Sequence, residues 1–141
     1  MEISRNKQHD YAFQVIYSFL ILETCKVTID FQKIIELIYD EPYDEIDVFS
    51  KELLIDSLKY QNIIINFVEK YLKNWRFNRL NYCSQAILIL SLAEYYYMKD
   101  VDKAVIINIA VKLAKKYAGE NDYRFINGVL DNCLKENGRI E

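Results

Sequence analysis

The sequence predicts an all-α fold. Its 141 residues include only three glycines and one proline, whereas β-sandwiches and dinucleotide-binding folds need more turn residues than that. Apolar residues recur at helical spacing along most of the chain, and no segment longer than a few residues alternates with the period of a strand. The chain is 52% hydrophobic and 28% charged, a globular balance. We therefore expect one domain over residues 1–141, long enough to bury a core.

Four helices are predicted in the first half of the chain. Ser4 is a suitable N-cap for the first, whose apolar residues repeat at helical spacing as far as Thr24. The second ends before Pro42, because proline disfavours helix in the residue that precedes it. The expected ranges are 4–24, 29–39, 46–58 and 62–73.

Three more helices are predicted after a linker, 76–82, which we expect Trp75 to anchor. Residues 83–98 are nearly all apolar, which predicts a central helix covered on most sides. The sixth helix starts at Asp102 and runs to 117, where Gly119 or Asn121 suits a left-handed C-terminal cap. The seventh covers 122–136 and contains Gly128, which costs about 1 kcal/mol relative to alanine. Close approach of a neighbouring helix, or of a ligand, would explain that glycine, and helix packing is the favoured explanation.

Charge and the reactive residue types limit the function. The net charge is -3, so binding to nucleic acid would require a local basic cluster. The cysteines, Cys25, Cys83 and Cys133, form no CxxC or Cys/His pair, which favours buried thiols in a reducing cytoplasm over a zinc site. His9 is the one histidine, in a terminus expected to be mobile, and no catalytic triad can be built around it.

Several motifs are absent from the sequence. It contains no phosphate-binding glycine loop and no calcium loop. We therefore expect no enzymatic activity, no metal and no cofactor. No apolar run reaches the ~20 residues of a membrane span, and no signal-peptide core follows the polar start. These features predict a cytoplasmic protein without a membrane segment.

The last third of the chain carries two sequence blocks with a family likeness. Residues 105–117 read VIINIAVKLAKKY, and residues 124–131 read RFINGVLD. They resemble the signatures VINEAVELAKKFG and KFVNGVLD of the NusB family, at a fitting separation. Weaker matches lie in the same order along the chain, namely AFQVIY at 12–17, LKNW at 72–75, AIL at 86–88 with Glu94, and Asp100-Val101. The resemblance covers the whole chain, and the block around Phe125 is its most specific part.

The resemblance implies a fold and a function. The fold is an all-α domain of two helical subbundles with seven helices. The function is transcription antitermination, in which the protein binds a boxA-type single-stranded RNA of ribosomal transcripts together with ribosomal protein S10 (NusE) in the RNA polymerase antitermination complex. The RNA-binding residues expected from it are Arg5, Lys7, Gln14, Asn121, Arg124 and Phe125. The residues expected to face the protein partner are Tyr17, Arg79, Ser84 and Glu94.

Physical arguments support part of this assignment and leave alternatives open. Cations at a helix start oppose its macrodipole, so Arg5 and Lys7 favour a role outside the fold, such as phosphate contact. Phe125, or Tyr123 beside it, can stack on an unpaired base. Phe125 is also spaced with Val129 at i, i+4, so core packing competes with that role. The lysines of the sixth helix either extend a basic track or form a solvated face, and they are Lys103, Lys112, Lys115 and Lys116.

The sequence departs from the family pattern at several positions. Its basic start is thinned to Arg5, Lys7 and His9, while Ile89, Ile109 and Asp102 stand where the signatures have arginine, glutamate and proline. We hypothesise that the arginine and glutamate form a pair in the family, which apolar packing replaces here at nearly no energetic cost. Burial of Glu94 in its apolar helix is costly unless the residue is paired or exposed. A structural salt bridge or a hydrogen bond to Tyr17 would satisfy it, as would a contact with a partner protein.

Two other functions remain open from the sequence. One is an interaction module that binds ribosomal protein S10 but has weak or no RNA affinity. The other is the helical RNA-binding domain that some ribosomal RNA cytosine methyltransferases carry, whose catalysis would need a separate chain. A homodimer is compatible with the aromatic-rich composition, although the sequence identifies no specific dimer interface.

Overall fold

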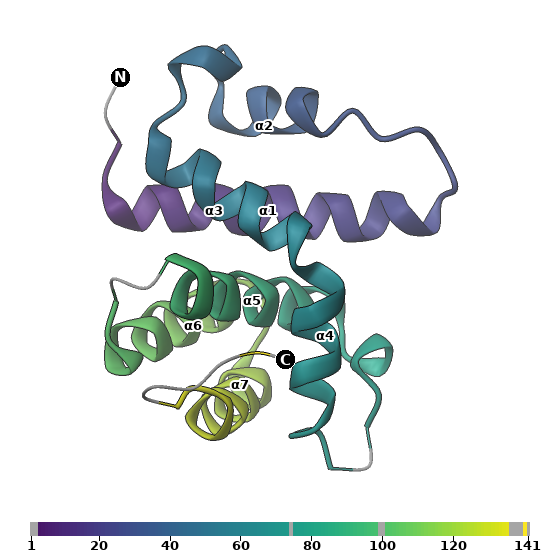
Figure 1. Ribbon diagram of the computed structural model, residues 1–141, viewed down its shortest axis with the longest axis vertical. Coiled ribbons are helices and arrows are strands. Elements are labelled where there is room, and N and C mark those ends of the chain that lie inside the picture. The colour runs from purple at the N-terminus through teal and green to yellow at the C-terminus, as the bar shows by residue number, and fades with distance from the viewer. Residues whose placement is uncertain (1–2, 74, 99–100, 136–139, 141) are drawn as a thin grey trace.

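The computed structural model describes residues 3–73, 75–98, 101–135 and 140, and these form helices and no strand (Figure 1). The seven α-helices are α1 (Arg5–Thr24), α2 (Phe31–Tyr39), α3 (Val48–Lys59), α4 (Gln61–Glu69), α5 (Tyr82–Ala93), α6 (Lys103–Tyr117) and α7 (Glu120–Cys133). Short 3₁₀ turns, η1 (Tyr43–Glu45) and η2 (Phe77–Arg79), and a π-helical segment, η3 (Glu94–Met98), complete the elements. The all-α prediction is confirmed. Three residues that the sequence motifs or expected helix ends include lie outside the described residues, namely Asn74, Asp100 and Glu136.

Four of the seven helices begin where a short polar side chain satisfies a free backbone N–H group. Ser4 accepts a hydrogen bond from the Lys7 N–H at 3.2 Å, as expected for the N-cap of α1. Three further helices have the same arrangement, with the N-caps Asp30, Asp47 and Asn81. Gly119 separates α6 from α7 with φ of 140°, a conformation open to glycine and strained for other residues.

The helices form two groups that meet along α1 and α5. Helix α1 packs against α2 and α3 on one side and against α5 on another, whereas α6 packs mainly against α7. In Figure 1, α1, α2 and α3 form the upper group, and α4 to α7 form the lower one. The arrangement agrees with the two expected subbundles.

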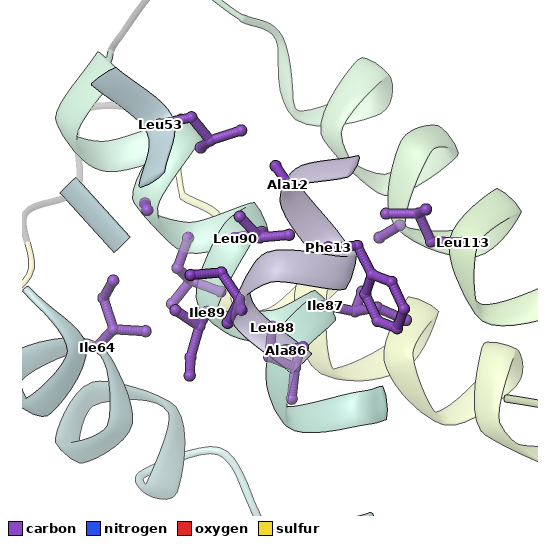
Figure 2. Close-up of a cluster of buried hydrophobic side chains, with 14 of the residues drawn as sticks. Ala12, Phe13, Leu53, Ile64, Ala86, Ile87, Leu88, Ile89, Leu90 and Leu113 are labelled. Carbon is purple, nitrogen blue, oxygen red and sulfur yellow. The ribbon is translucent and has the colours of Figure 1, made fainter. Parts of the chain in front are cut away.

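Helix α5 occupies the centre of the core. Every residue from Ser84 to Ala93 is buried, which explains why this segment lacks a polar face. Figure 2 shows its residues Ala86 to Leu90 among side chains of the surrounding helices. Those neighbours include Phe13 of α1, Leu53 of α3, Ile64 of α4 and Leu113 of α6. Full burial of each large apolar side chain contributes about 1.5–3 kcal/mol, so α5 organises the whole domain.

Two expectations about packing were wrong. A Cβ added at Gly128 would have no described atom within 4 Å, so close helix packing does not explain this glycine. Trp75 does not anchor the linker in the core, because 59% of its surface is exposed. Gly128 lies in the second half of α7 and Trp75 in the linker before α5, and both are exposed.

Candidate functional site

A cavity lies where the linker before α5 meets the start of α7. Its volume is about 300 Å³. Phe125 is half-buried there, with part of its side chain packed against the core and part exposed at the cavity. The residues that line this cavity, called here the Phe125 cavity, are Trp75, Arg79, Leu80, Asn81, Ser84, Asp122 and Phe125.

The polar groups of the Phe125 cavity come from the start of α5 and the turn before it. The Asn81 Oδ1 accepts a hydrogen bond from the Ser84 N–H at 2.8 Å, which caps α5. The Ser84 Oγ is buried and has no hydrogen-bond partner among the described residues. A buried hydroxyl without a partner costs about 1–3 kcal/mol. Arg79 is exposed and forms no ion pair with any residue that the structure describes.

A second polar cluster joins α1 to the end of α6. Asp10 accepts hydrogen bonds from the Lys116 ammonium and the Tyr117 hydroxyl. The Gln14 amide donates to the Asp10 Oδ1 at 3.0 Å and to the Tyr117 hydroxyl at 3.4 Å. Burial alone would raise the pKa of Asp10, but hydrogen bonds from Lys116, Tyr117 and Gln14 outweigh it and hold that pKa below its ordinary value. The cluster therefore fixes Gln14 and Lys116 against each other.

The lowered pKa of Asp10 predicts a pH-dependent effect on stability. A carboxyl whose pKa is lower in the folded state stabilises the fold above its unfolded pKa of about 3.9, and this contribution is lost as pH falls through the folded value. We expect Asp10→Asn to lower the free energy of unfolding by about 1 kcal/mol at pH 7, since the pair is partly exposed. The difference from the unchanged protein should shrink at pH 3 in urea unfolding. Asp44→Asn, at an exposed position of η1, is the control, and an equal loss at both pH values would contradict the assignment.

Tyr123, near the start of α7, has two cations close to its aromatic ring. The Lys115 ammonium lies 4.8 Å from the centre of its ring, and the Arg124 guanidinium lies 5.9 Å from it. Cations over an aromatic face are held by the charge distribution of the ring while remaining open to anions. Asn121 is exposed in the first turn of α7, close in sequence to Tyr123 and Arg124.

The predicted RNA-binding residues do not all lie on the same side of the molecule. Lys7 and Gln14 are two helical turns apart and so share one side of α1, where the cluster around Asp10 lies. Arg5 and Lys7 point about 200° apart around the helix. The Arg5 guanidinium lies 3.6 Å from the centre of the Phe49 ring and lines a different cavity, of about 460 Å³. The N-terminal cations are thus divided between two surfaces.

His9 and Glu94 form a buried pair that the sequence did not reveal. The His9 Nε2 lies 2.7 Å from the Glu94 Oε1, and 4% of each residue is exposed. The His9 Nδ1 lies 2.9 Å from the Arg5 carbonyl oxygen, which can only accept, so Nδ1 carries a proton. The expectation that His9 is mobile was wrong, and Glu94 bonds His9 rather than Tyr17. The two residues are 85 positions apart, so no local pattern could have paired them.

The residues expected to face a protein partner do not form one surface. Tyr17 is half-buried, with its ring stacked on Phe13 at 5.8 Å. Arg79 and Ser84 line the Phe125 cavity instead. Glu94 lies ten residues beyond Ser84, about 15 Å along the helix axis, and its burial leaves no carboxylate surface for a partner.

The three cysteine thiols differ in their exposure to solvent. Cys25 is exposed, Cys83 is half-buried and Cys133 is buried, so the expectation of buried thiols was wrong for Cys25. Burial raises the pKa of the Cys133 thiol to about 12. Within the described ranges, His, Cys, Asp and Glu side chains form no group of three suited to a metal ion. None of the helices in this part of the chain has the length and apolar character needed to cross a membrane.

Comparison with known proteins places this architecture in a family. The model of the NusB family matches residues 6–135. The chain belongs to the NusB family. It is similar to the transcription antitermination protein NusB of Thermodesulfovibrio yellowstonii, with 30% identity over 141 residues that cover 95% of this chain and 93% of the relative. The NusB of Finegoldia magna is 32% identical over 134 residues, covering 94% and 95% of the two chains.

Solved NusB structures have the same fold. The T. maritima NusB structure superposes with a TM-score of 0.82 at 26% identity, over 100% of this chain and 96% of the other. A crystal structure of the antitermination factors NusB and NusE in complex with dsRNA contains a chain that matches with a TM-score of 0.79 at 25% identity, over 94% and 96% of the two chains. These NusB structures cover nearly the whole domain, including both helical groups.

Proposed function

We propose that this NusB family member is a transcription antitermination factor that binds boxA-type single-stranded RNA together with ribosomal protein S10 (NusE). The observation that carries the proposal is the Phe125 cavity, which brings aromatic faces and a free guanidinium to one place. The likeness to a NusB chain solved with NusE and dsRNA supports it. The role is binding, with no chemical step, and it belongs in the cytoplasm, where nascent ribosomal transcripts are made.

The cavity suits a nucleotide because each part of a nucleotide meets a matching group. A base stacks on the exposed faces of Phe125 or Trp75, which is worth about 1–3 kcal/mol per base. Arg79 at the cavity and Arg124 on the first turns of α7 contact the adjoining phosphates.

A basic edge continues from the cavity toward α1. It consists of Arg124, Lys115, Lys116 and Lys7, with Gln14 held beside Lys116 by their shared contact with Asp10. This edge can neutralise only a few RNA phosphates, because Lys116 is already paired with Asp10 and the chain carries a net charge of -3. RNA affinity should therefore fall only shallowly with salt, by a log–log slope of about 0.7 for each phosphate contacted.

We place ribosomal protein S10 beside this edge, against the exposed part of Tyr17. Arg79, in the linker, lines the Phe125 cavity. We therefore assign it to the border between the proposed RNA surface and the proposed surface for ribosomal protein S10. Glu94 is not included, since its carboxylate is buried against His9. A partner placed in this way would cover one side of the bound RNA.

The alternative is an interaction module that binds ribosomal protein S10 with weak or no RNA affinity. One specific observation favours it. Arg5 and Lys7 are the lysine or arginine side chains at the start of α1, and Arg5 is stacked on Phe49, away from the basic edge. Lys7 is then the remaining N-terminal cation on that side.

A titration separates the two functions. Fluorescently labelled boxA-like single-stranded RNA is titrated with the protein at low salt, with and without ribosomal protein S10, and anisotropy is recorded. The lead proposal predicts binding that ribosomal protein S10 strengthens, and weaker binding to a scrambled strand or a duplex of the same length. Binding to ribosomal protein S10 without RNA binding selects the alternative, and failure to bind either one overturns both.

A further inference from the structure

Lysines and aromatic rings form a compact patch at the end of α4 and just beyond α7. The Lys70 ammonium lies 5.9 Å from the centre of the Phe67 ring, and the Lys135 ammonium lies 5.2 Å from that of Tyr71. The two rings are themselves 5.3 Å apart. Lys73 follows Lys70 by three residues. Together these residues form what we call the Lys135 patch, namely Phe67, Lys70, Tyr71, Lys73 and Lys135.

The positive charges of the Lys135 patch are not neutralised within the part of the chain that the structure describes. All three lysines are exposed, and none has an ion pair with a described residue. The carboxylate next to them in sequence, Glu69, accepts a hydrogen bond from the Phe77 N–H at 2.9 Å and so is turned to the linker. In a chain with a net charge of -3, this is a local surplus of positive charge.

The backbone at Lys135 is hydrogen-bonded to the core. The Tyr96 hydroxyl donates to the Cys133 carbonyl oxygen at 2.5 Å and accepts from the Lys135 N–H at 3.3 Å. Tyr96 is buried and belongs to η3, which follows the central helix. The backbone that presents Lys135 is therefore tied to the core, and less ordering entropy is lost when an anion binds there.

Two short stretches of chain connect the Lys135 patch with residues of the Phe125 cavity. Trp75, at the cavity, follows Lys73 by two residues. Phe125, also at the cavity, lies eight residues before the end of α7, about 12 Å along the helix axis. The Lys135–Tyr71 contact places the residue just beyond α7 against the turn that follows α4.

We propose that the Lys135 patch binds the backbone of RNA nucleotides that flank the one held in the Phe125 cavity. The inference rests on the proposed function and extends its site in the direction away from α1. A span of about 12 Å corresponds to roughly four stacked nucleotides at ~3.4 Å each. The short chain connections to a nucleotide-sized cavity favour RNA over an acidic protein segment, and the half-buried Tyr71 ring offers a further face for stacking.

The test compares a short boxA-like strand with strands extended by about four nucleotides at either end. The variant combines Lys70→Ala, Lys73→Ala and Lys135→Ala. We expect one extended strand to bind the unchanged protein about tenfold more tightly than the short strand, and the variant to lose this gain. The log–log salt slope for that strand should fall by about 2, from three lost phosphate contacts.

A matched control combines Lys33→Ala, Lys51→Ala and Lys59→Ala. Two of these lysines also lie over rings, Lys51 over Tyr43 and Lys59 over Tyr60, each at 5.2 Å, but on the side of α2 and α3. The control should bind every strand as the unchanged protein does, and circular dichroism should show that both variants remain helical.

The outcomes separate the inference from the proposed function. Loss of the gain with unchanged affinity for the short strand supports the Lys135 patch. If the unchanged protein binds the short strand but the variant keeps the gain, or loses affinity equally for all strands, the patch proposal is overturned while RNA binding stands. If the unchanged protein binds no strand, both are overturned.

Discussion

Replacing His9 with alanine should lower the free energy of unfolding by about 3–5 kcal/mol. The reason is that the Glu94 carboxylate is buried and would lose its partner, the His9 Nε2, which lies 2.7 Å from the Glu94 Oε1. The same change removes the link from the start of α1 to η3. Urea unfolding followed by circular dichroism at pH 7 measures the effect.

A second variant keeps this expectation falsifiable. His9→Leu combined with Glu94→Leu removes both polar groups, and such replacements of buried pairs by apolar residues are often neutral, so it should be more stable than His9→Ala. Lys103→Ala is the control, since its ion pair with Asp131 at 3.1 Å is exposed and should contribute less than about 1 kcal/mol. A loss below 1 kcal/mol for His9→Ala would show that the pair does not stabilise the fold.

Replacing Phe125 with alanine should weaken RNA binding by about 5-fold to 150-fold, the equivalent of the 1–3 kcal/mol expected for stacking one base. The residue is half-buried, so part of its ring is available at the cavity while the rest packs on the core. Fluorescence anisotropy with boxA-like RNA in the presence of ribosomal protein S10 measures the change.

The matched control for this variant is Phe19→Ala. Phe19 is also a half-buried phenylalanine, with its ring against Phe31 at 5.7 Å in the α1–α2 group. Both variants should lose some stability, but only Phe125→Ala should lose RNA affinity. Equal affinity for RNA in the two variants would assign Phe125 to the core alone.

The fold was predictable because local patterns determine it. Helical spacing and polar caps such as Ser4 act over a few residues, and the lack of a polar face in α5 indicates its central position directly. Differences occur at helix ends. The fourth helix ends at Glu69 rather than residue 73, and the last five residues of the fifth form a π-helical segment, since the end of a helix depends on tertiary contacts that the sequence pattern does not contain.

The candidate site was less predictable because it depends on contacts between distant segments. The opposite directions of Arg5 and Lys7 follow from helix geometry and were available from the sequence. The pairing of His9 with Glu94 was not, nor was the meeting of Trp75 with Phe125 at one cavity. Trp75 suggested an anchor because large aromatic residues dominate cores, and only the placement of the linker exposes it.

The burial of α5 from Ser84 to Ala93 affects how binding can be detected by amide hydrogen exchange. Backbone amides from Ser84 to Ala93 are enclosed on every side, so their exchange requires opening of the whole domain. The linker before α5 is exposed at Trp75 and Arg79 and opens locally at a much smaller free-energy cost. A ligand in the adjoining cavity would therefore slow exchange in the linker first. The amides of α5 would instead report the global stability of the domain.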